Sequence, residues 1–316
     1  MKITTSYLTY AIYFLAGLLL MWAAFTRVSI HEVIDVLIHG NYFLAIPVLT
    51  VSFLGYVFRI SRWQIMLRQM NEHVDKKTLL ASLCIGYGMN YAVPRLGELT
   101  RCALLRKSHH LEFDKSLLSV AVERIVDTMC LFLLLALLVL LYSADVANFM
   151  YKNIWIHMQE KFTYVHYIVA FILACLLLVA LYFVYAKARK SFLFYKTMAV
   201  QLLSTLLLPT FWIYTIGIWI CYYLMTYLWF YTFTETSVLT LSDAFFIMII
   251  GSIGRSVPIQ GGGLGAYHFL VAQACLLLGV SLVAGNALAI VIHGIQSVFT
   301  LALTAIAYIW FVKTYR

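Results

Sequence analysis

Three ionisable residues, Glu123, Arg124 and Asp127, stand together inside a run of otherwise apolar residues. Glu123 and Asp127 are four positions apart and would share one face of a helix, whereas Arg124 and Asp127 are three apart and could pair. Two carboxylates against one guanidinium leave a negative charge, so a cation from elsewhere is needed. Arg95 and Arg101 are the nearest candidates in sequence. The group could lock helices together as an internal network, or it could line a polar cavity.

Four polar residues surround Pro94, where a helix is expected to end because proline lacks an N–H donor and disfavours helix before it. They are Asn90, Arg95, Glu98 and Arg101. Arg95 follows the proline directly and would lie at the tip of a turn, where its guanidinium could bind a phosphate through two hydrogen bonds. Glu98 and Arg101 would share a helix face. A surface position is the alternative for Arg95.

A second set of polar and glycine residues follows Arg255, an arginine inside an apolar segment, where facing lipid would be costly. Gly262 and Gly263 belong to a glycine run, and a helix is expected from about Gly265. Its first backbone N–H groups would be ready to bind an anion. His268 lies one turn into that helix. The nearby arginine favours a phosphate site, although a glycine run can also serve only as a tight turn.

Sequence motifs for catalysis or metal binding do not occur. The chain has no GxSxG, no GxxxxGK[ST] and no HExxH, and its Gly-x-Gly pairs do not follow a predicted strand. We therefore predict no catalytic residue, no metal and no cofactor. His293 is grouped with Glu123, Arg124 and Asp127 in an intramembrane polar network, with an ordinary buried hydrogen bond as the alternative.

The composition identifies the environment in which these residues must work. Of the 316 residues, 64% are hydrophobic and 11% are charged, whereas soluble domains have roughly 25% charged and 45–50% apolar residues. A soluble enzyme and a disordered chain are excluded, and an all-α polytopic membrane protein is indicated. The net charge of +9 then reflects orientation in an anionic bilayer rather than binding to nucleic acid.

Apolar runs divide into long and short ones. A spanning helix needs about 20 apolar residues, and runs of about that length are predicted at residues 7–27, 42–60, 117–141, 164–185, 210–231 and 287–311. The run at 7–27 lacks a small-residue cleavage site, so we interpret it as a transmembrane helix and not as a signal peptide. Shorter or interrupted runs lie at residues 79–93, 241–257 and 266–281.

The basic residues predict the orientation. Of the 22 Lys and Arg, 17 lie in stretches that would then be cytoplasmic: five in 59–77, five in 95–115, four in 187–196 and three at the termini. The complementary loops hold three, and Arg124 and Arg255 are within apolar segments. Positive residues favour the cytoplasmic side. We therefore expect a multi-pass protein of the cell membrane with both termini in the cytoplasm.

This orientation has a consequence for the short runs. The run at 79–93 has basic stretches on both sides, so it must enter the membrane and turn back, and the runs at 241–257 and 266–281 must do so together from the opposite face. The prediction is a single domain, residues 1–316, with about six full spans and two oppositely oriented re-entrant hairpins. Each hairpin has a glycine-bearing helix that ends in Val-Pro, which suggests an inverted pseudo-repeat. Such paired broken segments are typical of transporter binding sites, although glycine kinks in ordinary helices are the alternative.

These motifs resemble those of a known family. Asn90-x3-Pro94-Arg95-x-Gly97-Glu98-x2-Arg101, Glu123-Arg124-x2-Asp127 and Pro258 with Gly262-Gly263-Leu264-Gly265 are similar to the flippase-like transmembrane domain of lysylphosphatidylglycerol synthases, which also exists as stand-alone proteins. The resemblance covers nearly the whole chain. It implies a role in moving a lipid between leaflets and two opposed re-entrant hairpins.

Two departures from the family limit what the resemblance implies. The sequence continues only to Arg316, without a soluble aminoacyl-transferase domain, so we expect no synthase activity. His268 stands where many members have a glutamate, which weakens the expectation of a cationic headgroup.

The leading hypothesis is a lipid flippase without an ATP site, in which the two hairpin tips form a polar groove. Arg95, Arg101 or Arg255 would hold the phosphate of an anionic phospholipid or another lipid phosphate. Acidic residues, namely Glu98, Glu123 and Asp127, would balance these cations or contact the headgroup.

Two other functions remain open at this point. The chain could be a membrane-embedded enzyme acting on lipid-linked phosphate or sugar, with Glu123, Asp127 and His293 as acid or base. It could instead dock a separate lipid-modifying enzyme at its basic cytoplasmic loops. A second copy of the chain is a further expected partner, and nucleic acid is not.

Overall fold

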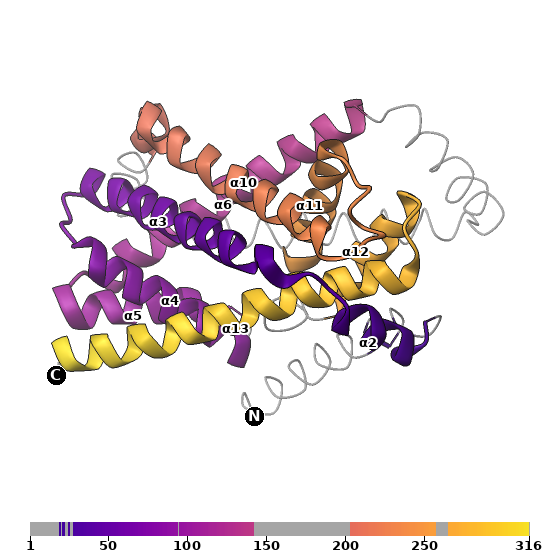
Figure 1. The fold of residues 1–316 in the computed structure, drawn as a ribbon. Coiled ribbons are helices and arrows are strands. Elements are labelled where there is room, and N and C mark those ends of the chain that lie inside the picture. The colour runs from indigo at the N-terminus through magenta and orange to yellow at the C-terminus, as the bar shows by residue number, and fades with distance from the viewer. Residues whose placement is uncertain are drawn as a thin grey trace, which may run out of the picture.

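The structure is a computed structural model that describes residues 19, 21–22, 25, 28–93, 95–141, 203–256 and 265–315. Every regular element in these ranges is a helix, which confirms the all-α prediction (Figure 1). The α-helices are α2 (Ile30–Ile38), α3 (Ala45–Gln69), α4 (Lys76–Ala92), α5 (Leu96–His109), α6 (Phe113–Leu141), α10 (Pro209–Trp229), α11 (Leu241–Ser256), α12 (Ala266–Leu277) and α13 (Leu282–Thr314). Short 3-10 helices are η1 (Tyr42–Leu44), η3 (Thr205–Leu207) and η4 (Phe230–Thr232).

Three described segments are long and apolar enough to cross a membrane: Tyr42–Gln69, Pro209–Thr232 and Leu282–Thr314. They confirm the runs predicted at 42–60, 210–231 and 287–311, and α6 covers the run at 117–141. The predicted span at 164–185 lies outside the described residues, as does most of the span at 7–27.

The predicted end of the second span, at residue 60, was wrong. The helix continues to Gln69 because Trp63, Met66 and Leu67 extend the apolar face of the helix and are fully buried. Arg59 and Arg62, which the charge count placed in a cytoplasmic loop, are therefore buried within α3.

Besides the nine-residue α2, four described α-helices, namely α4, α5, α11 and α12, are too short to cross the hydrocarbon core of about 30 Å. At 1.5 Å per residue, the 17 residues of α4 and the 16 of α11 reach only about 25 Å. Helix α4 ends where Pro94 predicts, since it stops at Ala92 and Val93 is extended. Its return helix α5 starts after Arg95, and α12 starts after Gly265, as the sequence predicts.

The short helices form two close pairs, α4 with α5 and α11 with α12. Glycine permits the close approach in each pair. A methyl group added at Gly97 would overlap the carbonyl oxygen of Gly86 across the first pair. One added at Gly254 would lie 2.9 Å from Cα of Tyr267 across the second. The helices in each pair therefore touch backbone to backbone near the tip of the hairpin.

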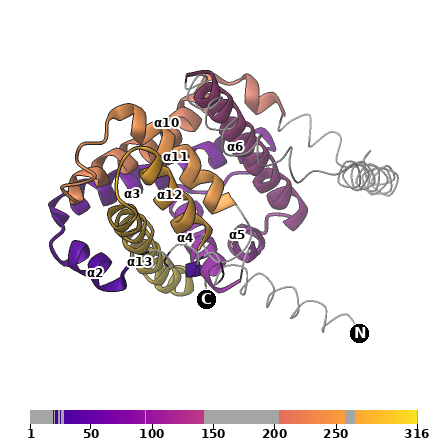
Figure 2. The ribbon, with the colours of Figure 1, turned by 90° about the vertical axis from the view of Figure 1, so that its right-hand side faces the viewer.

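The bases of the two hairpins lie at opposite ends of the molecule (Figure 1). At one end, Tyr315 at the C-terminus hydrogen-bonds through its hydroxyl to Thr78 (2.6 Å), near the start of α4. At the other end, the backbone N–H of Ser281, between α12 and α13, donates to Glu235 (3.4 Å), which precedes α11. The long helix α13 runs between these ends and packs against both α4 and α12. Figure 2, which looks along α13, shows α6 on one side of the molecule and α2 on the other.

The outer faces of the long helices remain apolar. Exposed fractions reach 66% for Phe132 on α6, 61% for Ile213 on α10 and 65% for Ile306 on α13. A surface this apolar indicates a non-aqueous environment. The protein is therefore located in a membrane. The polar residues described below face the interior of the protein and not the lipid.

Candidate functional site

Glu123, on α6, is the centre of a buried network of ionic groups. Its carboxylate is fully buried and pairs with Arg101 of α5 through two contacts, at 3.0 Å and 3.4 Å. Arg124 donates to the same carboxylate from the next position on α6. The Arg101 guanidinium also lies 4.0 Å above the centre of the Trp63 ring, which helps to fix its orientation.

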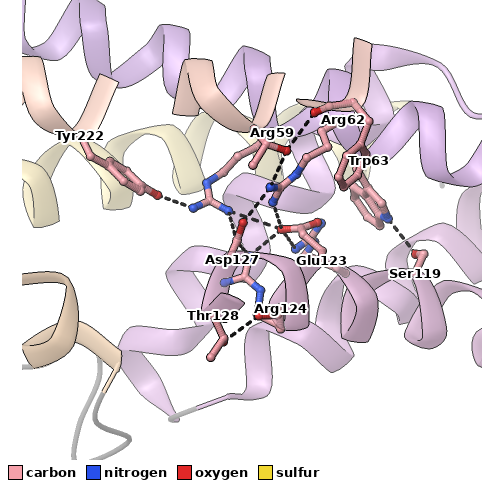
Figure 3. Close-up of polar contacts among 12 residues, drawn as sticks. Arg59, Arg62, Trp63, Ser119, Glu123, Arg124, Asp127, Thr128 and Tyr222 are labelled. Carbon is pink, nitrogen blue, oxygen red and sulfur yellow. Dashed lines mark hydrogen bonds and ion pairs between the residues drawn. The ribbon is translucent and has the colours of Figure 1, made fainter. Parts of the chain in front are cut away.

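Asp127, one turn along α6, holds the other side of the network. Its carboxylate pairs with Arg62 at 2.7 Å, with Arg59 at 3.2 Å and with Arg124 at 3.3 Å. Arg59 also reaches Glu123 at 3.4 Å and donates to the hydroxyl of Tyr222 on α10. Figure 3 shows the two carboxylates of α6 facing the arginines of α3.

The network has more positive than negative charge. We call it the arginine–carboxylate cluster, and its members are Arg59, Arg62, Arg101, Arg124, Glu123 and Asp127. Four guanidiniums against two carboxylates leave a formal excess of two positive charges. Uncompensated charge is expensive in a low-dielectric interior, so the cluster is suited to hold an additional anion.

A cavity of about 260 Å³ adjoins the cluster, and we call it the central cavity. Both hairpins contribute to its wall: Asn90 and Tyr91 from the end of α4, and Arg255 from the end of α11. Arg59 and Arg124 bring the cluster to the cavity surface. The two hairpin tips thus approach one polar space from opposite directions.

The rest of the wall is rich in hydroxyl and other polar groups. Further polar residues along it are Ser52, Tyr56, Tyr87, Tyr222, His293, Gln296 and Thr300. No carboxylate is among the described residues that line the cavity. Glu123 and Asp127 contact the arginines of the wall but do not reach the cavity themselves.

The residues predicted around Pro94 occupy different places. The side-chain oxygen of Asn90 accepts a hydrogen bond from the backbone N–H of Gly97 (2.7 Å) and so joins α4 to the start of α5. Arg101 is part of the cluster. Glu98 is half-buried, and no described residue is a hydrogen-bond partner of its Oε2. Arg95, in the left-handed region with φ 65°, is exposed and does not line the cavity.

The residues predicted around the second break are brought together in part. Arg255 is exposed at the cavity, 4.5 Å from the ring centre of Tyr267. His268 is buried, and its Nδ1 has no hydrogen-bond partner within the described ranges. Its ring lies 5.0 Å from that of His293, which does line the cavity. Gly265 precedes α12 with φ 87°. Gly262 and Gly263 lie outside the described residues.

Arg59, Arg62 and Tyr222 are the site residues that sequence reasoning missed. A signal for the two arginines was present: they are three positions apart and alternate with apolar residues at helical spacing through Leu67. Tyr222 carried no such signal, because it is one of many aromatic residues on an apolar helix.

Comparison with known proteins adds independent information. A family model described as Lysylphosphatidylglycerol synthase TM region matches residues 8–304, nearly the whole chain. No curated protein and no solved structure matches the chain. The family is membrane-embedded and lipid-related, in agreement with the apolar helices. The chain therefore belongs to the family of the lysylphosphatidylglycerol synthase transmembrane region, as its motifs predict.

Proposed function

We propose that the protein is a lipid translocase that moves a phosphate-bearing lipid between the two leaflets. The headgroup would pass through the central cavity while the acyl chains stay in the surrounding bilayer. One observation carries the proposal: Arg59, Arg124 and Arg255 line a cavity at the ends of α4 and α11, and no carboxylate is among the described residues of its wall.

The proposed topology has about six full spans and two re-entrant hairpins, with both termini in the cytoplasm. The short lengths of α4, α5, α11 and α12 support it, since none of them reaches 30 Å. The charges support it as well. The end of the molecule that holds the C-terminus also holds Lys76 and Lys107, whereas the opposite end holds Glu235 and Asp243.

The cavity would act by lowering the energy of the headgroup at the middle of the membrane. A charged group at the bilayer centre costs several kcal/mol in contact with lipid. Fixed guanidiniums and hydroxyl groups replace the water that the phosphate loses, as the broken helices of transporters do for their substrates. Arg124 and Arg255 are partly exposed, so a headgroup can reach them from outside the helix bundle.

The experiment is a leaflet-exchange assay with the full chain in liposomes that contain a fluorescent anionic phospholipid. We expect faster exchange than in protein-free vesicles. Arg255→Gln should slow it about tenfold, because a hydrogen bond to a charged group contributes about 1.5–3 kcal/mol. The matched control is Arg106→Gln, an exposed arginine of α5 away from the cavity, which should leave exchange unchanged. Exchange no faster than in empty vesicles, across several anionic lipids, would refute the proposal.

A further inference from the structure

We infer that the lipid bound in the central cavity carries a terminal phosphate monoester or a diphosphate, and no cationic group on its headgroup. The inference rests on the proposed function and names its substrate class. The observation behind it is the charge of the cavity wall, which is positive on the sides of both hairpins and has no described acidic residue.

The excess positive charge of the cavity wall determines which ligand charge would compensate it best. The arginine–carboxylate cluster has an excess of two positive charges. Arg255 adds a third, since no described carboxylate lies within ion-pair distance of it. A phosphodiester brings a single negative charge, whereas a phosphate monoester has a charge near −2 at neutral pH. The monoester or a diphosphate therefore compensates the wall more completely.

The buried hydrogen-bond donors of the cluster also favour a phosphate group as the ligand. Nε of Arg124, whose side chain lines the cavity, is buried and has no hydrogen-bond partner among the described residues. Behind it, Nε of Arg101 and Nε of Arg62 are also buried without one. The cluster therefore has spare donors and few spare acceptors. Phosphate oxygens accept hydrogen bonds and donate few, so they complement this surface.

A cationic headgroup fits the wall poorly. An ammonium group needs a carboxylate or an open aromatic face. The ring of Tyr222 is already approached by Arg59 at 5.6 Å, and the other tyrosines of the wall share the cavity with three guanidiniums, which would repel an ammonium group. His268, next to the cavity residue His293, supplies no negative charge.

The size of the cavity favours a small headgroup. Pockets for drug-sized ligands enclose about 300–1,000 Å³, and the central cavity has about 260 Å³. One or two phosphate groups require less space than a glycerol esterified with an amino acid. Both size and charge therefore distinguish this cavity from one built for an aminoacylated phospholipid.

The experiment compares short-chain lipids that differ in headgroup charge. Binding to the purified full-length protein in detergent is measured by native mass spectrometry with dioctanoyl phosphatidic acid and dioctanoyl phosphatidylmethanol. The two differ by one methyl group and one charge. We expect phosphatidic acid to bind about tenfold more tightly, and dioctanoyl lysylphosphatidylglycerol to bind more weakly than either. Equal binding of the first two, or tightest binding of the cationic lipid, would overturn the inference.

Variants connect the preference to the cavity. Arg255→Gln should reduce the tenfold preference to about two- to threefold, Arg255→Lys should keep most of it, and Arg106→Gln should keep all of it. Arg255 is exposed and outside the buried cluster, so these variants are expected to fold. An unchanged preference in Arg255→Gln would place the selectivity elsewhere and contradict the inference.

Two further arms separate the inference from its premises. Inorganic phosphate should bind far more weakly than phosphatidic acid, and tighter binding of inorganic phosphate would overturn the assignment to a lipid. In liposomes, exchange of lysylphosphatidylglycerol but not of phosphatidic acid would contradict this inference and leave the proposed function intact. Selective binding of phosphatidic acid without exchange of any lipid would support the inferred ligand and refute translocation.

Discussion

At the scale of single residues, Glu123 is the most constrained group of the described structure. It is fully buried and lies within 4 Å of Arg59, Arg62, Arg101 and Arg124. Three of these arginines, Arg59, Arg62 and Arg124, also pair with Asp127, whereas the printed ion pair of Arg101 is with Glu123. Removal of Glu123 would leave four arginines, three of them buried, around one acid.

Replacing Glu123 with glutamine should therefore destabilise the protein strongly. Removing one member of a buried ionic pair costs about 3–5 kcal/mol. The control is Glu72→Gln, which breaks a partly exposed pair with Lys115 (2.9 Å) that should contribute no more than about 1 kcal/mol. Thermal unfolding in detergent, followed by tryptophan fluorescence, measures both. Equal melting temperatures for the two variants would contradict the central role of Glu123.

The excess of arginine predicts an asymmetry within the cluster. Arg62→Met lowers the positive excess by one, whereas Glu123→Gln raises it by one. Arg62 is fully buried and does not line the cavity, so methionine can fill much of its volume. We expect a smaller loss of thermal stability for Arg62→Met than for Glu123→Gln. The opposite order would show that the arginines are not in excess.

The sequence located part of this cluster and missed the rest for a physical reason. The high energy of charge in an apolar segment identified Glu123, Arg124 and Asp127, and the missing cation was found at Arg101. Arg59 and Arg62 were assigned to a loop because a count of charges cannot tell where a helix ends. Only the packing of α3 against α6 and α10 shows that they face inward.

At the scale of elements, the hairpin of α4 and α5 depends on close backbone contact. Gly97 lies against the carbonyl oxygen of Gly86, and its N–H is bound by Asn90, which lines the cavity. A side chain at this position would push the two helices apart and move the cavity wall. The position of the hairpin tip therefore depends on the absence of a side chain at Gly97.

Gly97→Ala should consequently impair both folding and lipid exchange. Its methyl group would meet backbone, which cannot move aside as a flexible side chain can. The control is Gly294→Ala on α13, where an added methyl group would meet no atom of the described residues within 4 Å. That change should stabilise the helix by up to about 1 kcal/mol. Melting temperature and exchange rate measure both variants, and similar effects at the two glycines would contradict the close contact.

Helix boundaries were predictable where the local sequence determines them. Proline predicted the C-terminal end of α4 and glycine the start of α12, because the effects of these residues are confined to adjacent positions. The direction of Arg95 was not predictable. Pro94 ends the helix but does not determine which way the next side chain points, and Arg95 adopts φ 65° and remains exposed.

At the scale of the whole molecule, the two hairpins start from opposite ends and meet at the central cavity. The charges of the loops predict which end of the molecule faces which side of the membrane, since basic residues collect at the end with the C-terminus. They do not predict that both hairpins line one cavity, because that depends on residues far apart in sequence, such as Tyr91 and Arg255.

Cysteine labelling can test which end faces which side of the membrane. Lys107→Cys and Ser237→Cys introduce thiols at exposed positions, one at each end of the molecule. With a membrane-impermeant maleimide on intact cells, we expect labelling at position 237 and none at 107 until the cells are permeabilised. The parent chain serves as the control for its own cysteines. Labelling of both positions from outside would contradict the proposed topology.

The unbroken helix α13 has a consequence for the choice of cargo. It contacts one hairpin at Gly285, beside Cys275, and the other at Thr304, which donates to the carbonyl oxygen of Cys84 (2.8 Å). These two contacts are about 28 Å apart along the helix axis. The helix thus holds α12 and α4 at a fixed separation along its axis. Four extra residues between the two contacts would add one turn and widen that separation by about 6 Å, so in the proposed translocase the length of α13 would limit the size of the headgroup.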